Sequence, residues 1–363
     1  IALILALAGS GCAIIPLPLN TTSVSLARDT ESLQPEHLIT DEPIAGATIP
    51  SQIDRRKMMA GVESLPMPVQ RLPLSDSGTL NVLLGQSSGT TGEPKQFFLT
   101  HEHLVARAER GLESGTRSND SRYGLMVGFS FFLAISAILS HLRSGATLVY
   151  VDERSPVPLV EELKRKRINN VFLIPQTLEA LLEAVPPAPD PILPDVRVLT
   201  SSSSLPPRTK RALRERICPG LVEIYGSNEI YSISIDRPEV DNAWPDATGK
   251  LAESIEVEVV DDNYQPLSPG EAGHLRVNAN SPWMCKSYIR GPNQNHIGFI
   301  DGWFFPGDIA AINEDGYLFL KGRTDDMINQ AVLKIFPIEI ESTLMTHPAV
   351  AEAAVTAVPD RRY

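Results

Sequence analysis

The sequence predicts an α/β protein: a large N-terminal domain of helix-covered sheets plus a small β-rich subdomain, followed by the start of a small α+β C-terminal domain. Between residues 80 and 217, short apolar runs bounded by turn residues alternate with amphipathic segments of helix length, which is typical of parallel sheets covered by helices. After Trp244 the apolar residues recur with a period of two, which favours antiparallel strands. We place the domains at residues 1–243, 244–324 and 325–363.

Each element of the N-terminal domain is predicted from its local pattern. Residues 1–17 (IALILALAGSGCAIIPL) predict a buried helix that leads into a buried strand. A signal peptide is the alternative, but no basic segment precedes the apolar run, which continues beyond Cys12. Strands are expected at residues 80–86, 145–152, 169–175 and 194–203, and helices at 102–115, 156–168, 176–185 and 206–217.

The remainder of the chain predicts strands and then a last helix. Residues 255–279 alternate with a period of two and contain turn residues, and residues 315–323 read as a further strand. Residues 336–358 predict a helix followed by the beginning of a new strand. The sequence contains no membrane-spanning run of apolar residues.

Composition narrows the class of protein. The 363 residues are 42% apolar and 21% charged, which argues against global disorder. The net charge is −12, from 32 basic and 44 acidic residues, so nucleic acid is not expected as the main partner. Three cysteines without a CxxC pair indicate reduced thiols in a cytoplasmic protein and argue against structural zinc.

One loop is unusually polar. Residues 87–95 read SSGTTGEPK and follow a predicted strand. Glycines allow backbone N–H groups to turn inwards, hydroxyl groups add donors, and Lys95 adds a positive charge, so between a strand and a helix this loop would form a nest for phosphate oxygens. It is not the GxxxxGK[ST] loop, because proline precedes the lysine. An ordinary surface loop is the alternative that these residues leave open.

Four later residues suit a nucleotide, although each has a simpler interpretation. The Glu229 carboxylate suits Mg²⁺ but also a solvated loop. Asp308, in a Gly-Asp turn, suits ribose hydroxyls but also turn formation. Arg323 suits ribose or phosphate but also a surface ion pair, and Tyr225 suits stacking on adenine but also core packing.

Several motifs occur together and resemble one family. The loop at residues 87–95, with the following THEH (residues 100–103), resembles the phosphate loop of the adenylate-forming superfamily, which includes acyl-CoA synthetases, luciferases and peptide-synthetase adenylation domains. YGSNE (225–229), FFPGDIA (304–310), EDGYLFLKGRTDDMI (314–328) and KIFPIEIE (334–341) resemble further motifs of that superfamily, in order and over most of the chain.

The resemblance implies a two-step reaction and a set of site residues. A carboxylic acid would react with ATP and Mg²⁺ to give an acyl-adenylate, and a thiol, either coenzyme A or the phosphopantetheine of a carrier protein, would take the acyl group. Catalytic roles would fall to Lys95, Asn228 and Glu229, with Glu229 holding Mg²⁺ and Asp325 acting as the hinge. The nucleotide would be bound by Ser87, Ser88, Gly89, Thr90, Thr91, Gly92, Lys95, Tyr225, Gly226, Asn228, Asp308 and Arg323.

The chain departs from the superfamily pattern at several places. Asn228 and Pro306 each replace a threonine, Asn329 replaces a common lysine, and Val332 replaces a glycine of the loop that approaches the thiol. The residue at 332 puts thioester formation in question. The catalytic lysine of the superfamily is expected beyond Tyr363, and part of its N-terminal domain is expected ahead of Ile1, so we expect this chain to bind nucleotide but to adenylate poorly.

The acid itself is predicted only by class. Members that activate α-amino acids place an aspartate near residues 127–130, and no carboxylate is present there, so we expect an acid without an α-amino group, such as an aryl or fatty acid. Phe129, Ser130, Ser202 and Ser203 are the candidate pocket residues. Two alternatives stay open: an adenylating protein that loads a carrier protein, and a non-catalytic relative that binds nucleotide or acyl groups. The sequence does not indicate the oligomeric state.

Overall fold

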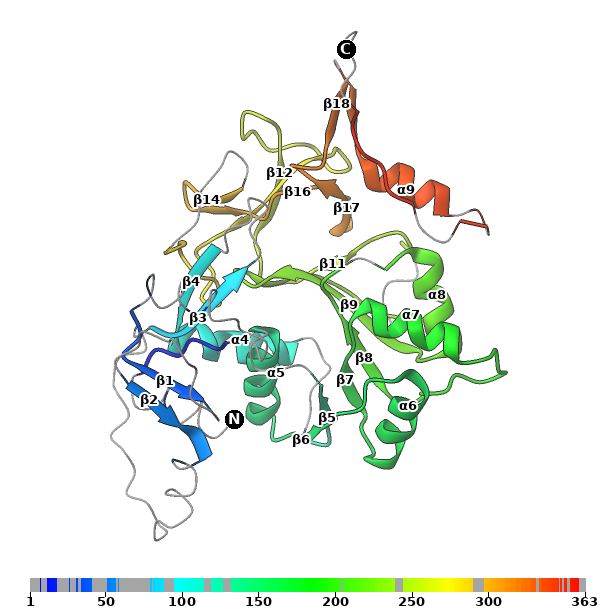
Figure 1. Cartoon of the computed structure of the whole chain (residues 1–363). Helices are drawn as coiled ribbons and strands as arrows, with labels where there is room; N and C mark the ends of the chain where they lie inside the picture. Colours follow the sequence, from blue (N-terminus) through cyan, green and yellow to red (C-terminus); the bar gives the residue numbers. More distant parts are fainter. Residues whose placement is uncertain are drawn as a thin grey trace.

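The computed structural model is drawn in Figure 1. It describes residues 7, 12–17, 26, 31, 34–40, 51–56, 58, 79, 81–87, 95–113, 119–126, 132–203, 205–238, 244–289, 297–330, 333–345, 347, 349, 350 and 353–358. Thirteen strands within these ranges form one sheet in the order β14-β15-β13-β16-β17-β11-β10-β9-β8-β7-β5-β6, with β12 paired to β13. The fold is therefore α/β, as the sequence predicts.

One end of the sheet is parallel and covered by helices. Its strands run in parallel from β6 to β9, and the crossovers between them contain helices. This arrangement confirms the strands and helices predicted between residues 145 and 217. The elements are β5 (Arg122–Leu125), α5 (Phe132–Arg143), β6 (Thr147–Tyr150), α6 (Pro156–Arg165), β7 (Asn170–Phe172), α7 (Pro175–Ala184), β8 (Arg197–Thr200), α8 (Pro207–Arg216) and β9 (Gly220–Ser227).

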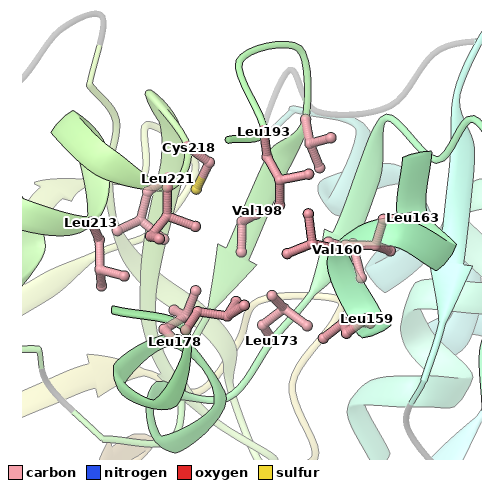
Figure 2. Packing of buried hydrophobic residues seen from close by; sticks show 14 of the residues in the cluster. Leu159, Val160, Leu163, Leu173, Leu178, Leu193, Val198, Leu213, Cys218 and Leu221 are labelled. Atoms are coloured by element: carbon pink, nitrogen blue, oxygen red, sulfur yellow. The ribbon is translucent and has the colours of Figure 1, made fainter. Parts of the chain in front are cut away.

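Successive residues of the parallel strands enter two different cores, one on each face. Val198 of β8 lies in the core between the sheet and helices α6, α7 and α8, where Leu159, Leu178 and Leu213 are fully buried (Figure 2). The next residue, Leu199, packs on the opposite face with Ile138 of α5. Because side chains alternate across a strand, both faces of these strands need apolar residues.

The other end of the sheet is antiparallel. Glycine and turn residues separate its short strands, and their inward residues form a third core around Leu275, Phe304 and Leu318. The boundary that we place before Trp244 falls between β10 and β11, which are neighbours in the same sheet. The strands are β10 (Tyr231–Asp236), β11 (Gly249–Leu251), β12 (Val257–Val260), β13 (Gly273–Asn278), β14 (Gly298–Ile300), β15 (Trp303–Phe305), β16 (Asp308–Ile312) and β17 (Tyr317–Arg323).

The polar loop has a different setting from the one expected. It joins β3 (Asn81–Ser87) to β4 (Lys95–Thr100), which pair antiparallel with Ser87 opposite Lys95, and α4 (His101–Glu113) begins only after β4. The loop is expected from the sequence to lie between a strand and a helix, and it lies instead between two strands, so that expectation is wrong. Residues 95–100 form a strand because Phe97 and Leu99 are buried in the core and their backbone groups pair with β3. The N-terminus of α4 therefore does not directly follow Lys95.

A reciprocal cap begins α4. The N–H of His103 donates to Oγ1 of Thr100 at 3.3 Å, and the N–H of Thr100 donates to Nδ1 of His103 at 3.2 Å. This is the geometry of a capping box with histidine in place of the usual Glu or Gln. Burial, aided by the positive charges of Arg107 and Lys286, lowers the pKa of His103 to about 4. The ring is therefore neutral near pH 7, so Nδ1 can accept this bond.

A buried charged cluster joins α8 to the strands. Lys210 of α8 contacts the carboxylates of Glu223 and Asp236, each at 2.6 Å, and Arg214 contacts Asp236 at 2.9 Å. Burial alone would lower the pKa of Lys210, but the two carboxylates raise it above its usual value. The second oxygen of Glu223 accepts the N–H of Leu205 at 2.8 Å, so this cluster also holds the chain that follows Ser203.

The two ends of the chain are described only in part. Ile14 forms a parallel bridge with Leu83 of β3, and β1 (His37–Thr40) and β2 (Ser51–Asp54) form a separate parallel pair. At the other end lie β18 (Ile328–Gln330), β19 (Leu333–Ile335) and α9 (Pro337–Met345). The predicted helix is confirmed, but the strand predicted to follow it is wrong over residues 353–358, which pair with no strand among the described residues. A strand requires a neighbour to satisfy its backbone groups.

None of the helices in the described ranges has the length and apolar character needed to cross a membrane.

Candidate functional site

Five charged residues from three separate stretches of the sequence interact electrostatically at one end of the antiparallel strands. Asp308 begins β16 and lies opposite Arg323, the last residue of β17. Glu229 lies in the turn between β9 and β10, and Lys95 begins β4. The charges of Glu229, Arg323 and Asp325 all affect the pKa of Lys95. The fold therefore gathers the positions that the motifs singled out.

The Asp308 carboxylate is held by two partners. Its Oδ2 accepts the hydroxyl of Tyr225 at 2.5 Å, and its Oδ1 accepts Nη1 of Arg323 at 3.0 Å. Burial and the Asp308 charge raise the pKa of Tyr225 well above its usual range, so the hydroxyl stays protonated and donates. Each carboxylate oxygen has a second lone pair, so Asp308 retains capacity to accept hydroxyl groups. Tyr225 also packs against the antiparallel core.

Arg323 is fixed by further contacts. Its Nη1 donates to the carbonyl oxygen of Pro306 at 2.7 Å, and its Nε lies 3.4 Å from Oδ1 of Asp325. Burial alone would lower the pKa of Arg323, but Asp308 and Asp325 raise it. Gly307 has a φ of +85°, and a Cβ there would lie 2.8 Å from Nη2 of Arg323. Glycine therefore allows the guanidinium to cross the backbone directly before Asp308.

Glu229 is held by both its backbone and its side chain. It is 4% exposed, and its Oε1 accepts the hydroxyl of Tyr288 at 2.9 Å. Its carbonyl oxygen accepts Nη2 of Arg107 at 3.0 Å and the N–H of Cys285 at 3.2 Å. Burial and the Glu229 charge raise the pKa of Tyr288 above its usual range, so this hydroxyl also remains a donor. The carboxylate is thus presented in one orientation.

Lys95 lies half-buried between charges of both signs. Its ammonium lies 5.3 Å from the centroid of the Tyr288 ring. Burial lowers the pKa of Lys95, and Arg323 adds to this effect, whereas Glu229 and Asp325 oppose it. A cation in this position has lost part of its hydration, so its attraction to an anionic ligand is stronger than that of an exposed lysine.

The remaining predicted residues are only partly placed. Gly226 packs so closely that a Cβ would meet the Tyr231 carbonyl oxygen at 1.8 Å. Ser202 and Ser203 are exposed and follow β8, while Asn228 is half-buried beside Glu229. Ser87 ends β3, and Asn329 lies in β18. Outside the described residues lie Ser88, Gly89, Thr90, Thr91, Gly92, Phe129, Ser130 and Val332.

Two residues of this site were not predicted. Arg107 lies on the face of α4 that also buries Leu104 and Ala108, and it is fully buried. An arginine at an apolar position of a helical pattern is the signal that would have found it. Tyr288 is 59 residues from Glu229, and no sequence spacing connects the two.

A single buried carboxylate fits Mg²⁺ that arrives with a nucleotide. Mg²⁺ keeps several waters and commonly takes one or two protein carboxylates together with substrate phosphates. Over the ranges that the structure describes, no group of three or more His, Cys, Asp and Glu residues forms a metal site of its own. Glu229 with its second oxygen therefore has the chemistry of one such ligand.

Comparisons with known proteins agree on one family. The profile described as "AMP-binding enzyme" matches residues 1–289, and "AMP-binding enzyme C-terminal domain" matches residues 339–363. A salicyl-AMP ligase / salicyl-S-ArCP synthetase from Mycobacterium tuberculosis is 31% identical over 80% of this chain and 51% of its own length. A 2-succinylbenzoate–CoA ligase from Bacillus licheniformis is 26% identical over 97% of this chain and 73% of its own.

Solved structures show the same fold. The O-succinylbenzoate coenzyme A synthetase of Bacillus subtilis in complex with AMP superposes with a TM-score of 0.82 at 24% identity, over 99% of this chain and 73% of that one. The amide bond synthetase McbA of Marinactinospora thermotolerans gives 0.83 at 26% identity, over 99% and 74%. The chain spans about half the length of several curated relatives: 51% of the salicyl-AMP ligase and 56% of an acyl–CoA ligase of Bacillus subtilis.

Proposed function

Because the chain belongs to the family of AMP-binding enzymes, we propose that it activates a carboxylic acid with ATP and passes the acyl group to a thiol. The observation that carries this proposal is the convergence of Lys95, Glu229, Asp308 and Arg323 on one site. Two of these side chains are cationic and suit phosphate or ribose, and two are carboxylates that suit Mg²⁺ and ribose hydroxyls.

The proposed first step forms an acyl-adenylate. A carboxylate oxygen attacks the α-phosphorus of ATP, and the bond from that phosphorus to the bridging oxygen of the β-phosphate breaks, which releases pyrophosphate. Lys95 neutralises charge on the outer phosphates, and the amide of Asn228 donates to the α-phosphate. Bound Mg²⁺, held by Glu229, would neutralise further phosphate charge. Residues 87–92 would add backbone and hydroxyl donors around the phosphates.

The nucleoside would lie against the other half of the site. Asp308 accepts from the ribose hydroxyls with its remaining lone pairs, and Arg323 donates beside it. We place Tyr225 and Gly226 on the adenine side; glycine is required at 226 by the close Tyr231 carbonyl oxygen of β10. We propose Asp325 as the hinge between residues 244–324 and 325–363, because it lies two residues beyond the end of β17 and contacts Arg323.

We propose an acid without an α-amino group, of aryl or fatty type. Two relatives named above carry the names of aromatic acids, salicylate and 2-succinylbenzoate, which supports an aryl acid. Ser202 and Ser203, exposed beyond the carboxyl end of β8, are the described candidates for the pocket. Coenzyme A is the proposed acceptor. Loading of a carrier protein is the second candidate, since the Mycobacterium tuberculosis relative is named for that reaction as well.

The test is acid-dependent exchange of pyrophosphate into ATP. It uses this chain and, beside it, the longest form of the protein that its gene encodes, each with a panel of aryl, short-chain and long-chain fatty acids. Exchange with one class of acid would establish adenylation and identify the substrate class. Binding of ATP without exchange in either form, across the whole panel, would contradict adenylation and favour a non-catalytic nucleotide-binding protein.

A further inference from the structure

One tyrosine contacts both of the charged groups that face the proposed phosphates. The hydroxyl of Tyr288 donates to Oε1 of Glu229 at 2.9 Å, and its ring lies under the ammonium of Lys95, 5.3 Å from the centroid. Glu229 and Lys95 come from separate elements, the turn after β9 and the start of β4. Tyr288 therefore bridges a carboxylate and a cation that no local backbone connection brings together.

The segment that carries Tyr288 is attached on both sides. The N–H of Cys285 donates to the carbonyl oxygen of Glu229 at 3.2 Å, and the N–H of Ile289 donates to the carbonyl oxygen of Gln96 at 2.7 Å. Gln96 is the residue after Lys95, so residues 285–289 span the distance between the two charged groups. Their backbone contacts limit the movement of the tyrosine relative to either group.

The ring of Tyr288 is also packed. It lies edge-on to Phe299 at 5.2 Å and to Phe304 at 6.5 Å between centroids, and Phe304 is buried in the antiparallel core. A ring held by two aromatic neighbours and by its backbone has little rotamer freedom left to lose on binding. Its hydroxyl is thus a fixed donor rather than a mobile one.

We propose that Tyr288 is a positioning residue, which orients the Glu229 carboxylate for Mg²⁺ and supports Lys95 for the phosphates of the metal–nucleotide complex. This inference rests on the proposed function. A hydrogen bond on Oε1 selects one rotamer of the carboxylate and leaves Oε2 for the metal, which is how outer partners commonly tune metal ligands. The ring attracts the ammonium through its negative face and limits the volume that the lysine side chain explores.

Two variants separate the hydroxyl from the ring. Tyr288→Phe removes only the hydroxyl and retains the packing, so the affinity for ATP without metal should stay unchanged. The gain in ATP affinity that Mg²⁺ provides should fall about tenfold or more, as is typical when an outer partner of a metal ligand is lost. Tyr288→Leu removes the ring as well and should also weaken metal-free ATP binding about two- to fivefold, through the loss of the cation–π contact.

Titration calorimetry with ATP, with and without magnesium chloride, measures both affinities, and urea unfolding checks the fold of each variant. Tyr317→Phe is the matched control, because Lys250 lies 5.7 Å over the Tyr317 ring, away from Glu229. It should leave both affinities unchanged. Adding Tyr288→Phe to Glu229→Gln should change nothing further, since the carboxylate that the hydroxyl orients is already gone.

Three outcomes would contradict the inference, and they are distinguishable. If the native chain shows no magnesium-dependent gain in ATP affinity, the proposed function fails and the inference fails with it. If the gain is present and requires Glu229, but Tyr288→Phe retains it, only the role of Tyr288 is wrong. If Tyr288→Phe lowers the gain in ATP affinity by the same factor in the native chain and in the Glu229→Gln variant, the tyrosine does not act through the carboxylate.

Discussion

Gly307→Ala tests whether the backbone before Asp308 is shaped to hold Arg323. Gly307 adopts a φ of +85°, which L-residues other than glycine rarely adopt. A Cβ at this position would lie 2.8 Å from Nη2 and 3.2 Å from Cζ of Arg323. Alanine therefore has two separate effects: it strains the backbone, and it displaces the guanidinium that donates to Asp308 and Pro306.

The two effects can be estimated separately. A left-handed backbone conformation costs an L-residue about 1–2 kcal/mol. Displacing Arg323 weakens its hydrogen bonds to Oδ1 of Asp308 and to the carbonyl oxygen of Pro306, for which about 1 kcal/mol of net loss is reasonable in a half-buried pair. Gly270 and Gly302 have φ values of +88° and +81°, and nothing lies within 4 Å of a Cβ at either position. Alanine there carries the backbone cost alone.

Equilibrium urea unfolding and AMP titration measure the two effects. We expect Gly307→Ala to lose about 1 kcal/mol more stability than Gly270→Ala and Gly302→Ala. If Arg323 holds the ribose, Gly307→Ala should also bind AMP about fivefold more weakly, which corresponds to that same energy, while the two controls bind normally. Equal stability losses in all three variants, together with native AMP affinity in Gly307→Ala, would refute the reasoning.

Three further changes are informative. Lys210→Met leaves Glu223 and Asp236 buried without their lysine and should lower the free energy of unfolding by about 3–5 kcal/mol, as measured in urea. The pKa of His103 is about 4 in the folded chain instead of 6.5, so between these values the unfolded chain binds more protons than the folded one. The contribution of neutral His103 to stability is therefore complete above pH 6.5 and is lost as the pH falls towards 4. His103→Gln can keep the helix cap and should show a smaller loss in urea unfolding across that window. Lys95→Ala should weaken ATP binding more than AMP binding in calorimetry, because its charge is proposed to face the outer phosphates.

Each of these has a plain contrary result. A Lys210→Met protein as stable as the native chain would show that Lys210 contributes no net stability, because the cost of its desolvation cancels its attraction to Glu223 and Asp236. An unchanged pH profile in His103→Gln would assign the acid lability to other groups. Equal losses for ATP and AMP in Lys95→Ala would contradict the assignment of the polar loop to phosphates.

Much of the secondary structure follows from local patterns. The helix predicted at residues 156–168 and the strand predicted at 169–175 are found as α6 and β7, because the spacing of apolar residues decides which face can be buried. The alternation of strands and helices along the chain also predicted the helix-covered parallel strands, since strands joined through helices pair in parallel. The family was indicated by motifs whose residues are contiguous, such as YGSNE at residues 225–229.

Local patterns failed where pairing with a distant segment decides the conformation. KQFFLT (residues 95–100) has a short apolar run that could belong to a loop or a helix start, and only its pairing with β3 makes it a strand. Residues 353–358 have an apolar strand-like pattern but no neighbour among the described residues, so they form none.

The sequence by itself determined the fold class and the order of most elements, and it predicted the residue types of the candidate site: a lysine, a glutamate, an aspartate and an arginine in recognisable motifs. Only the tertiary structure decided that Tyr288 contacts Glu229, 59 residues away, and that Arg107 holds the carbonyl oxygen of the same residue. The physical reason is that a motif records neighbours along the chain. The partners of a buried charge are set by how sheet and helix pack, because a buried polar group must find its hydrogen bonds wherever the fold places a donor.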